Sequence, residues 1–232
     1  MGSNFLPRPP PVALSALMSN AAKLKKKAVE FEQKKQYGKA LALYVQILES
    51  GAAGNTEPEV GLYNRVGDLL LRTGDANGAI GYYRKAVDLY AESGFLNNAI
   101  ALCNKILRQD PSQTVVHYRL GRISAQKGFK GDAKVHFLEY AQQMQRAGDM
   151  DESFRALKEF ADLCPDQDDI RLMLAEQLSK QGRSAEAAEQ LQTLHEKLTA
   201  EGRTAEARAA AERLAAIDPA AAPRTGGSSS AP

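Results

Sequence analysis

The chain has 232 residues, a net charge of +2 and 44% hydrophobic residues. A charge this close to zero gives no global attraction to nucleic acid or anionic lipid. The two cysteines, Cys103 and Cys164, lie far apart and suit free thiols in a reducing compartment. The apolar stretch 12–18 is too short for a signal peptide or a membrane span, so we expect a cytoplasmic protein without an integral membrane segment.

Residues 1–18 form a proline-rich leader that contains LPRPPP, and we expect it to be extended. The leader is either a docking motif for a proline-recognition domain or a solvated segment. A pair of helices is predicted within 19–57, capped by Ser19 or Asn20 and followed by a glycine-rich loop at 51–58. The basic cluster Lys23–Lys27 suggests either nucleic-acid or membrane docking or a solvated face. The absence of interleaved aromatic residues favours the solvated face.

Residues that end helices recur at intervals of 54 along the rest of the chain. Gly74 recurs as Gly128 and Gly182, and two further series, from Gly94 and from Pro111, repeat in the same way. A fixed period of such residues is typical of a stacked repeat protein. The landmarks define repeat units at 58–111, 112–165 and 166–218, and a low-complexity tail at 219–232 that we expect to be disordered.

Each repeat unit is predicted to contain three helices, because glycine suits the left-handed residue after a helix and proline cannot continue one. No segment shows the alternation of a strand. Together with the N-terminal pair, this gives an all-α fold of about eleven helices. The nine repeat helices are expected at 59–73, 77–93, 96–109, 112–127, 130–147, 150–163, 167–181, 184–201 and 204–216.

The first two helices of each unit resemble the tetratricopeptide repeat (TPR). The residues of unit 58–111 that match its pattern are Tyr63, Val66, Gly67, Leu70, Gly74, Ala79, Tyr83 and Ala86. The terminal proline of the pattern comes one helix later, so the middle helix serves in two overlapping repeats. The resemblance implies a right-handed α-solenoid in which Gly67 and Gly121 let helices approach closely, and Tyr83, Phe137 and Leu191 fill the space between them.

Candidates for chemistry are few. His117 replaces Tyr63 of the preceding unit and is interpreted as a packing residue rather than a ligand or base. Cys103 is expected to be buried and Cys164 to lie near the surface. The acidic run 166–169 suggests helix caps and favourable charge at a helix start more than a cation site. No metal, cofactor or catalytic motif is present, so we expect neither enzyme activity nor a cofactor.

TPR proteins usually bind peptides on the concave side, which is lined by the first helix of each repeat. The resemblance therefore implies partner-binding residues Asn64, Arg65, Asp68, Arg72, Tyr118, Arg119, Arg122 and Gln126. Their four arginines suit an acidic segment or a terminal carboxylate, and the alternative is a solvated helix face. Asp68 opposes the carboxylate clamp of chaperone-binding TPR domains.

The sequence therefore predicts a non-catalytic scaffold that binds a protein or peptide partner. The alternative is a structural subunit of a larger complex, with permanent contacts to neighbouring chains. The partner's identity and the oligomeric state do not follow from the sequence, and neither the leader nor Lys23–Lys27 is assigned a docking role.

Overall fold

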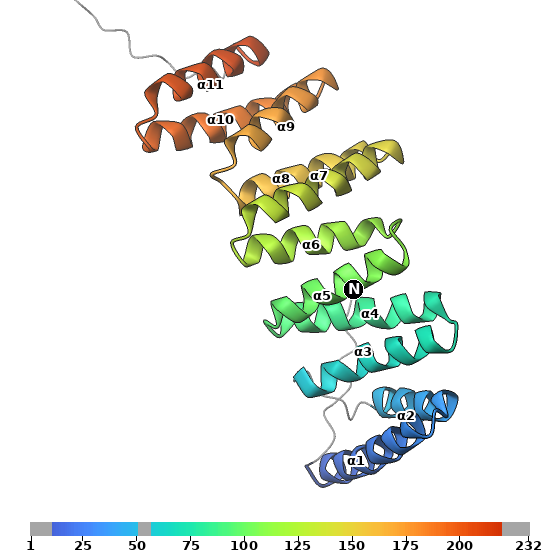
Figure 1. Ribbon diagram of the computed structural model, residues 1–232. Helices are drawn as coiled ribbons and strands as arrows, with labels where there is room; N and C mark the ends of the chain where they lie inside the picture. Colours follow the sequence, from blue (N-terminus) through green and yellow to red (C-terminus); the bar gives the residue numbers. More distant parts are fainter. Residues whose placement is uncertain (1–10, 51–56, 220–232) are drawn as a thin grey trace, which may run out of the picture. The chain divides into compact units, whose positions relative to one another are not determined.

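A computed structural model describes residues 11–50 and 57–219, which form eleven helices and no strand (Figure 1). The all-α fold class is thus confirmed, and the repeat helices begin and end within two residues of the predicted positions. The helices are α1 (Pro11–Gln33), α2 (Tyr37–Glu49), α3 (Glu57–Arg72), α4 (Ala76–Glu92), α5 (Leu96–Gln109), α6 (Thr114–Gln126), α7 (Lys130–Arg146), α8 (Met150–Leu163), α9 (Asp168–Lys180), α10 (Ser184–Ala200) and α11 (Thr204–Ile217).

The helices belong to two compact units, residues 1–116 and residues 117–232. Consecutive helices pack against each other in both units, as α3 does on α4 and α10 on α11. The boundary falls in the first turn of α6, inside the repeat predicted at 112–165. The division into three repeats, the handedness of the stack and the sharing of each middle helix between two overlapping repeats stay predictions from the sequence period.

Left-handed glycines end the helices at the predicted 54-residue intervals. Gly74, Gly128 and Gly182 have φ of 90°, 78° and 75°, and the second series, from Gly94, has φ between 73° and 83°. In two of these turns an aspartate caps the next helix: Asp75 accepts a hydrogen bond from the backbone of Gly78 at 2.8 Å, and Asp149 does the same for Glu152. The turns therefore set the helix boundaries through local backbone chemistry.

The turn between α1 and α2 uses a lysine where the later turns use glycine. Lys35 has φ of 56°, the only left-handed non-glycine residue among those described. Its Cβ crowds the backbone in this conformation, which is unfavourable by about 1–2 kcal/mol for a residue with a side chain. The turn is held by the bond from Gln36 N to Phe31 O, 2.8 Å long.

Replacing Lys35 with glycine is therefore expected to raise the free energy of unfolding by about 1 kcal/mol, because glycine removes the crowded Cβ. Urea denaturation followed by circular dichroism measures the change. Lys34→Gly is the matched control: Lys34 has no positive φ, so glycine there brings no conformational gain. Equal effects of the two substitutions would contradict the explanation.

The TPR resemblance is confirmed in the packing of the helix pairs. A Cβ placed on Gly67 would overlap the ring of Tyr83, and one on Gly121 would lie 2.7 Å from Cδ2 of Phe137. The two rings are fully buried, as is Leu191 at 2% exposure. The alanines expected at the helix crossings are also buried: Ala79, Ala99, Ala133 and Ala187. Small residues thus bring each helix close to the aromatic or leucine side chain of the next.

Two expectations about the N-terminal part were wrong. Helix α1 begins at Pro11, so residues 11–18 are helical rather than extended, and Ser19 and Asn20 lie inside the helix instead of capping it. Proline at the first helical position is favourable, since its missing N–H has no helical partner there, and the following apolar stretch continues the helix. Residues 1–10, with most of LPRPPP, lie outside the described residues, as do 220–232 of the predicted tail. The predicted loop is shorter at its end, because α3 begins at Glu57.

Two expectations about the α8–α9 connection also need correction. Cys164 is 1% exposed, because its side chain packs with Phe160 and Ile170. The N-cap of α9 is Gln167, which makes no side-chain capping bond. Asp168 and Asp169 do provide negative charge in the first turn, as expected, but their carboxylates make ion pairs with neighbouring helices.

Candidate functional site

The predicted residues of α3 are engaged in contacts within the first unit. Arg65 is half-exposed, and its guanidinium binds both carboxylate oxygens of Glu32 on α1, with Nε 2.9 Å from Oε1. The hydrogen bond with Glu32 raises the pKa of Arg65. Tyr44 of α2 donates to the same carboxylate at 2.8 Å, and burial, followed by that bond, raises the tyrosine pKa to about 12. Arg65 is therefore a fixed link between α1 and α3.

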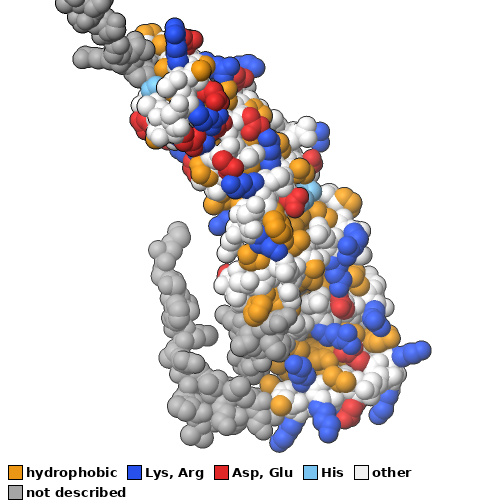
Figure 2. Space-filling model, turned by 60° about the vertical axis from the view of Figure 1, so that its left-hand side comes forward, with side chains coloured by type: hydrophobic (Ala, Val, Ile, Leu, Met, Phe, Trp, Pro, Cys, Tyr) orange, Lys and Arg blue, Asp and Glu red, His pale blue; other side chains and the backbone are white. Residues whose placement is uncertain are grey.

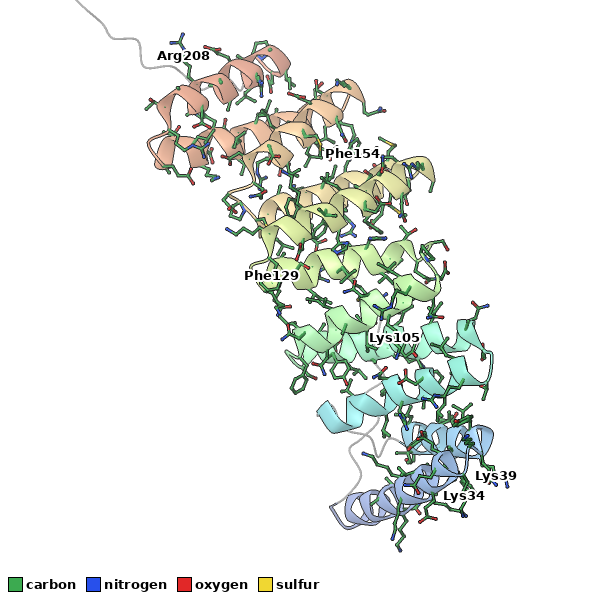
Figure 3. All side chains as sticks on the ribbon, in the orientation of Figure 1. Lys34, Lys39, Lys105, Phe129, Phe154 and Arg208 are labelled. Atoms are coloured by element: carbon green, nitrogen blue, oxygen red, sulfur yellow. The ribbon has the colours of Figure 1, made fainter. Side chains whose placement is uncertain are left out.

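Asp68 and Arg72 have partners other than those expected. The carboxylate of Asp68 pairs with Lys105 of α5, which Figure 3 labels, rather than with a neighbouring arginine. The same carboxylate accepts a hydrogen bond from Tyr83 at 2.7 Å. Lys105 Nζ also lies 3.4 Å from Oδ1 of Asn64. The Arg72 guanidinium lies over the ring of Tyr37, with Cζ 5.5 Å from the ring centroid. The four α3 residues thus contact four other helices, namely α1, α2, α4 and α5.

In the second unit, two of the four predicted residues of α6, Tyr118 and Arg122, contact α8. Arg122 Nε lies 3.0 Å from Oε1 of Glu159, and Tyr118 donates to Oε2 of the same carboxylate at 2.6 Å. Arg155 adds a third contact to that carboxylate at 3.1 Å. Arg119 was expected to be exposed but is half-buried, whereas Gln126 at the end of α6 is exposed. Charges of both signs are interspersed on the face that Figure 2 shows.

An ion pair between the first and third helix of each repeat recurs with alternating polarity. Asp68–Lys105, Arg122–Glu159 and Glu176–Arg213 occupy equivalent places, 54 residues apart, and the acid and the base exchange places at each step. We call these three contacts the interhelical ion pairs. All are partly exposed, so each contributes little to stability, at most about 1 kcal/mol. The predicted site residues Asp68 and Arg122 therefore already have charged partners within the chain.

A groove lies in the second unit, where sequence reasoning placed no site. It has a volume of about 450 Å³. Its apolar lining includes the buried Ala141 and Leu157 and the 63% exposed Val135. Its polar lining is mostly glutamine. We call this the α7–α9 groove, and its lining residues are Val135, Leu138, Glu139, Ala141, Gln142, Gln145, Leu157, Met173 and Gln177.

Polar contacts between α7 and α9 lie on both sides of the apolar part of the groove along the helices. Lys134 pairs with Asp169, and Gln145 Nε2 donates to Gln177 Oε1 at 3.3 Å. The first contact joins the beginnings of α7 and α9, and the second joins their later turns. The two helices therefore run parallel, as first helices of successive TPRs do. The sequence carried a signal for the groove: Val135 and Leu138 are apolar residues of α7 beyond the positions that the TPR pattern fills.

A second interhelical contact recurs in all three repeats, between the first and second helices. Tyr63 and Tyr82 have ring centroids 6.4 Å apart, His117 and His136 have Nδ1 atoms 3.3 Å apart, and Arg171 donates to Gln190 at 2.7 Å. These pairs are each separated by 19 residues and follow the 54-residue period. His117 thus packs between the first and second helices of its repeat, and the structure brings it together with a second histidine, which the sequence did not indicate.

The two histidines predict a pH dependence of stability. Burial lowers the pKa of both below the ordinary value of 6.5, and the neighbouring His117 lowers that of His136 further. The carboxylates of Glu139 and Asp132 act in the opposite direction. The unfolded chain therefore binds protons more readily, and the contribution of the pair is fully present above pH 6.5 and is lost as pH falls through the lower, folded pKa values.

The free energy of unfolding should accordingly fall between about pH 7.5 and 5. Urea denaturation at a series of pH values measures it. In the double variant His117→Tyr/His136→Tyr, which copies the Tyr63–Tyr82 pair of the first repeat, the slope over this range should be smaller. A slope unchanged by the double substitution would assign the effect to other groups.

Within the described part of the chain, no group of three or more His, Cys, Asp or Glu side chains is arranged to hold a metal ion. Across 11–50 and 57–219, no helix is both long and apolar enough to span a bilayer.

Comparison with known proteins gives matches of fold only. No protein-family model matches the chain, and no curated protein does. Solved structures that match include a tetratricopeptide repeat protein from Parabacteroides merdae (17% identity, 86% of this chain and 94% of that one, TM-score 0.28). A Podosopora anserina protein with nearly identical TPR-like repeats matches at 17% identity over 86% and 95% (TM-score 0.38). BtubC from P. vanneervenii matches at 16% over 88% and 91% (TM-score 0.33). Similarity at this level says nothing about function.

Proposed function

We propose that this chain is a non-catalytic TPR-type scaffold and that it binds a segment of a partner protein in the α7–α9 groove. The observation that carries the proposal is the groove itself, about 450 Å³ in volume with an apolar lining. Val135 is 63% exposed there, the most exposed large hydrophobic residue among those described. Apolar surface left open beside a concave site is typical of binding surfaces.

The lining defines the chemistry of the partner segment. Leu138 and Met173 offer contacts to an apolar side chain, and methionine adapts its shape to different ones. Gln142 and Gln177 each carry donors and an acceptor, which match the N–H and C=O groups of an extended peptide backbone. Because these contacts are largely uncharged, we expect an affinity that depends little on salt concentration.

The test compares two substitutions on exposed apolar residues of the second unit. Val135→Glu places a charge at the groove, whereas Leu163→Glu, on a residue 48% exposed and outside the groove lining, does not. A partner is first captured by the unaltered protein from its own cells and purified, and its dissociation constant is then measured. We expect Val135→Glu to weaken binding at least about tenfold, corresponding to 1.4 kcal/mol, and Leu163→Glu to leave it unchanged. Equal affinities of the two variants would exclude the groove.

An acidic partner segment bound by the arginines of α3 and α6 is the competing proposal. Arg65 and Arg122 already hold carboxylates of the chain, so a partner carboxylate has to displace them. The double variant Arg65→Glu/Arg119→Glu distinguishes the two proposals. If it abolishes binding while Val135→Glu does not, and if affinity falls steeply with salt, the arginine surface is the site.

A structural subunit of a larger complex is the alternative of a different class. A monomeric mass in solution favours the scaffold, and a stable oligomer favours the subunit. A cytoplasmic location is part of the proposal, and it is supported by Cys103 and Cys164, which are both buried and form no disulfide.

A further inference from the structure

The two histidines between α6 and α7 have the separation of a pair of metal ligands. Their Nδ1 atoms are 3.3 Å apart, and their rings are inclined by 42°. Two nitrogen ligands at about 2.0–2.1 Å from a tetrahedral Zn²⁺ ion lie roughly 3.3–3.4 Å from each other. Without a metal, a hydrogen bond at this distance has one Nδ1 as the donor and the other as the acceptor, depending on the tautomers of the two rings.

The equivalent contacts in the other repeats show that packing alone does not require histidine. Tyr63–Tyr82 and Arg171–Gln190 join the same two helices of their repeats at the same place. Neither pair brings two metal-ligating nitrogens together. The second repeat therefore differs from its neighbours in bringing two imidazole nitrogens close together.

The surroundings favour a cation at this point. Burial keeps both imidazoles in the neutral form near neutral pH, which is the form that binds metals. The carboxylates of Glu139 and Asp132 act electrostatically on His117 and His136 respectively. Glu139 accepts a hydrogen bond from Gln143 at 2.7 Å, and it lies three residues after His136, on the same face of α7. Negative charge thus lies beside the two ligands.

We propose that His117 and His136 form a two-histidine site for a divalent transition-metal ion of the class that prefers imidazole, represented by Zn²⁺. Imidazole suits zinc, copper and nickel, whereas magnesium and calcium prefer oxygen ligands. The two side chains supply two ligands, and water completes the coordination. Because one ligand comes from α6 and the other from α7, the bound ion joins the two helices and stabilises the second unit.

The test is a calorimetric titration of the untagged full chain with Zn²⁺ at about pH 7.5, combined with thermal unfolding with and without the ion. We expect one ion per chain and a midpoint of unfolding that rises with Zn²⁺. Both effects should disappear in His117→Tyr/His136→Tyr, which reproduces the Tyr63–Tyr82 pair of the first repeat. His195→Gln is the matched control, because its Nδ1 bonds to the carbonyl of Ala207 at 2.8 Å, away from the pair, and both effects should persist there.

Two further measurements keep the proposal falsifiable if the double variant does not fold. In the unaltered protein, the ring resonances of His117 and His136, but not of His195, should shift in saturable fashion with Zn²⁺. Binding should weaken at least tenfold at about pH 5.5, where protons compete for the imidazoles. Absence of saturable binding, shifts at His195 alone, or equal binding by a folded double variant would overturn the proposal.

Discussion

Phe137→Ala is expected to lower the free energy of unfolding of the second unit by about 3–5 kcal/mol. Phe137 is fully buried, and its ring contacts Phe160 and Tyr118 at centroid distances of 5.4 and 5.8 Å. Truncation leaves a cavity between three helices that are held by other contacts and cannot close over it. Urea denaturation followed by circular dichroism gives the change.

The same ring explains why Gly121 is a glycine, and this allows a sharper test. Gly121→Ala places a methyl group 2.7 Å from the ring, which should be unfavourable by roughly 1–3 kcal/mol. The third repeat shows the compatible combination, because Ala175 stands at the place of Gly121 and packs in one cluster with Leu191, the counterpart of Phe137. Gly121→Ala combined with Phe137→Leu should therefore be less destabilised than the sum of the single variants, and strict additivity would contradict this explanation.

Arg171→Met is expected to be the most destabilising substitution of a charged residue in the second unit, by about 3 kcal/mol. The Arg171 side chain is 8% exposed. It donates to Gln190 Oε1 and Asp162 Oδ1 at 2.7 Å and to the carbonyl of Ala161 at 2.8 Å. Methionine fills similar space but leaves the amide of Gln190 and the carbonyl of Ala161 without this donor. Asp162 is half-exposed, so water can solvate its carboxylate after the substitution. The expected loss of stability is therefore smaller than for a fully buried ion pair.

Two controls separate this network from a general effect of losing an arginine. Arg208→Met removes an exposed arginine that pairs with Glu212 (Figure 3), and it should change stability by less than about 0.5 kcal/mol. Arg171→Tyr combined with Gln190→Tyr, which copies the first repeat, should recover part of the loss. A similar loss for Arg208→Met and Arg171→Met would count against the buried network.

The parts of the fold that follow from local chemistry were predictable from the sequence. The turn glycines require positive φ, and their period gave the helix boundaries almost residue by residue. Where a turn uses another residue, the signal fails: Lys35 takes the same conformation without being glycine. The start of α1 was missed because the prolines before it were interpreted as extended structure, although Pro11 is at a position where helices accept proline.

The candidate site was less predictable, since side-chain partners depend on which faces of separate helices meet. Arg65 was identified as a surface residue, but Glu32, its partner, lies 33 residues earlier and could be assigned only once α1 and α3 were placed together. His136 could not be assigned as the partner of His117 for the same reason. Contacts between the first and second helices join residues 19 apart, and the interhelical ion pairs join residues 37 apart. Once these separations are known from one repeat, they identify the partners in the other two.

The alternating polarity of the interhelical ion pairs has a consequence for how the chain assembles as it is synthesised. Repeats with similar sequences can exchange helices with a neighbour and become trapped in a misassembled form. Had the third helix of the second repeat docked on the first, Glu159 would oppose Asp68, and the converse exchange would bring Lys105 against Arg122. An exchange between adjacent repeats would thus replace an attraction by a repulsion of like charges at each of these places. Asp68 and Arg213, from the first and third repeats, would still attract, so this discrimination acts between neighbours, where wrong encounters are most frequent.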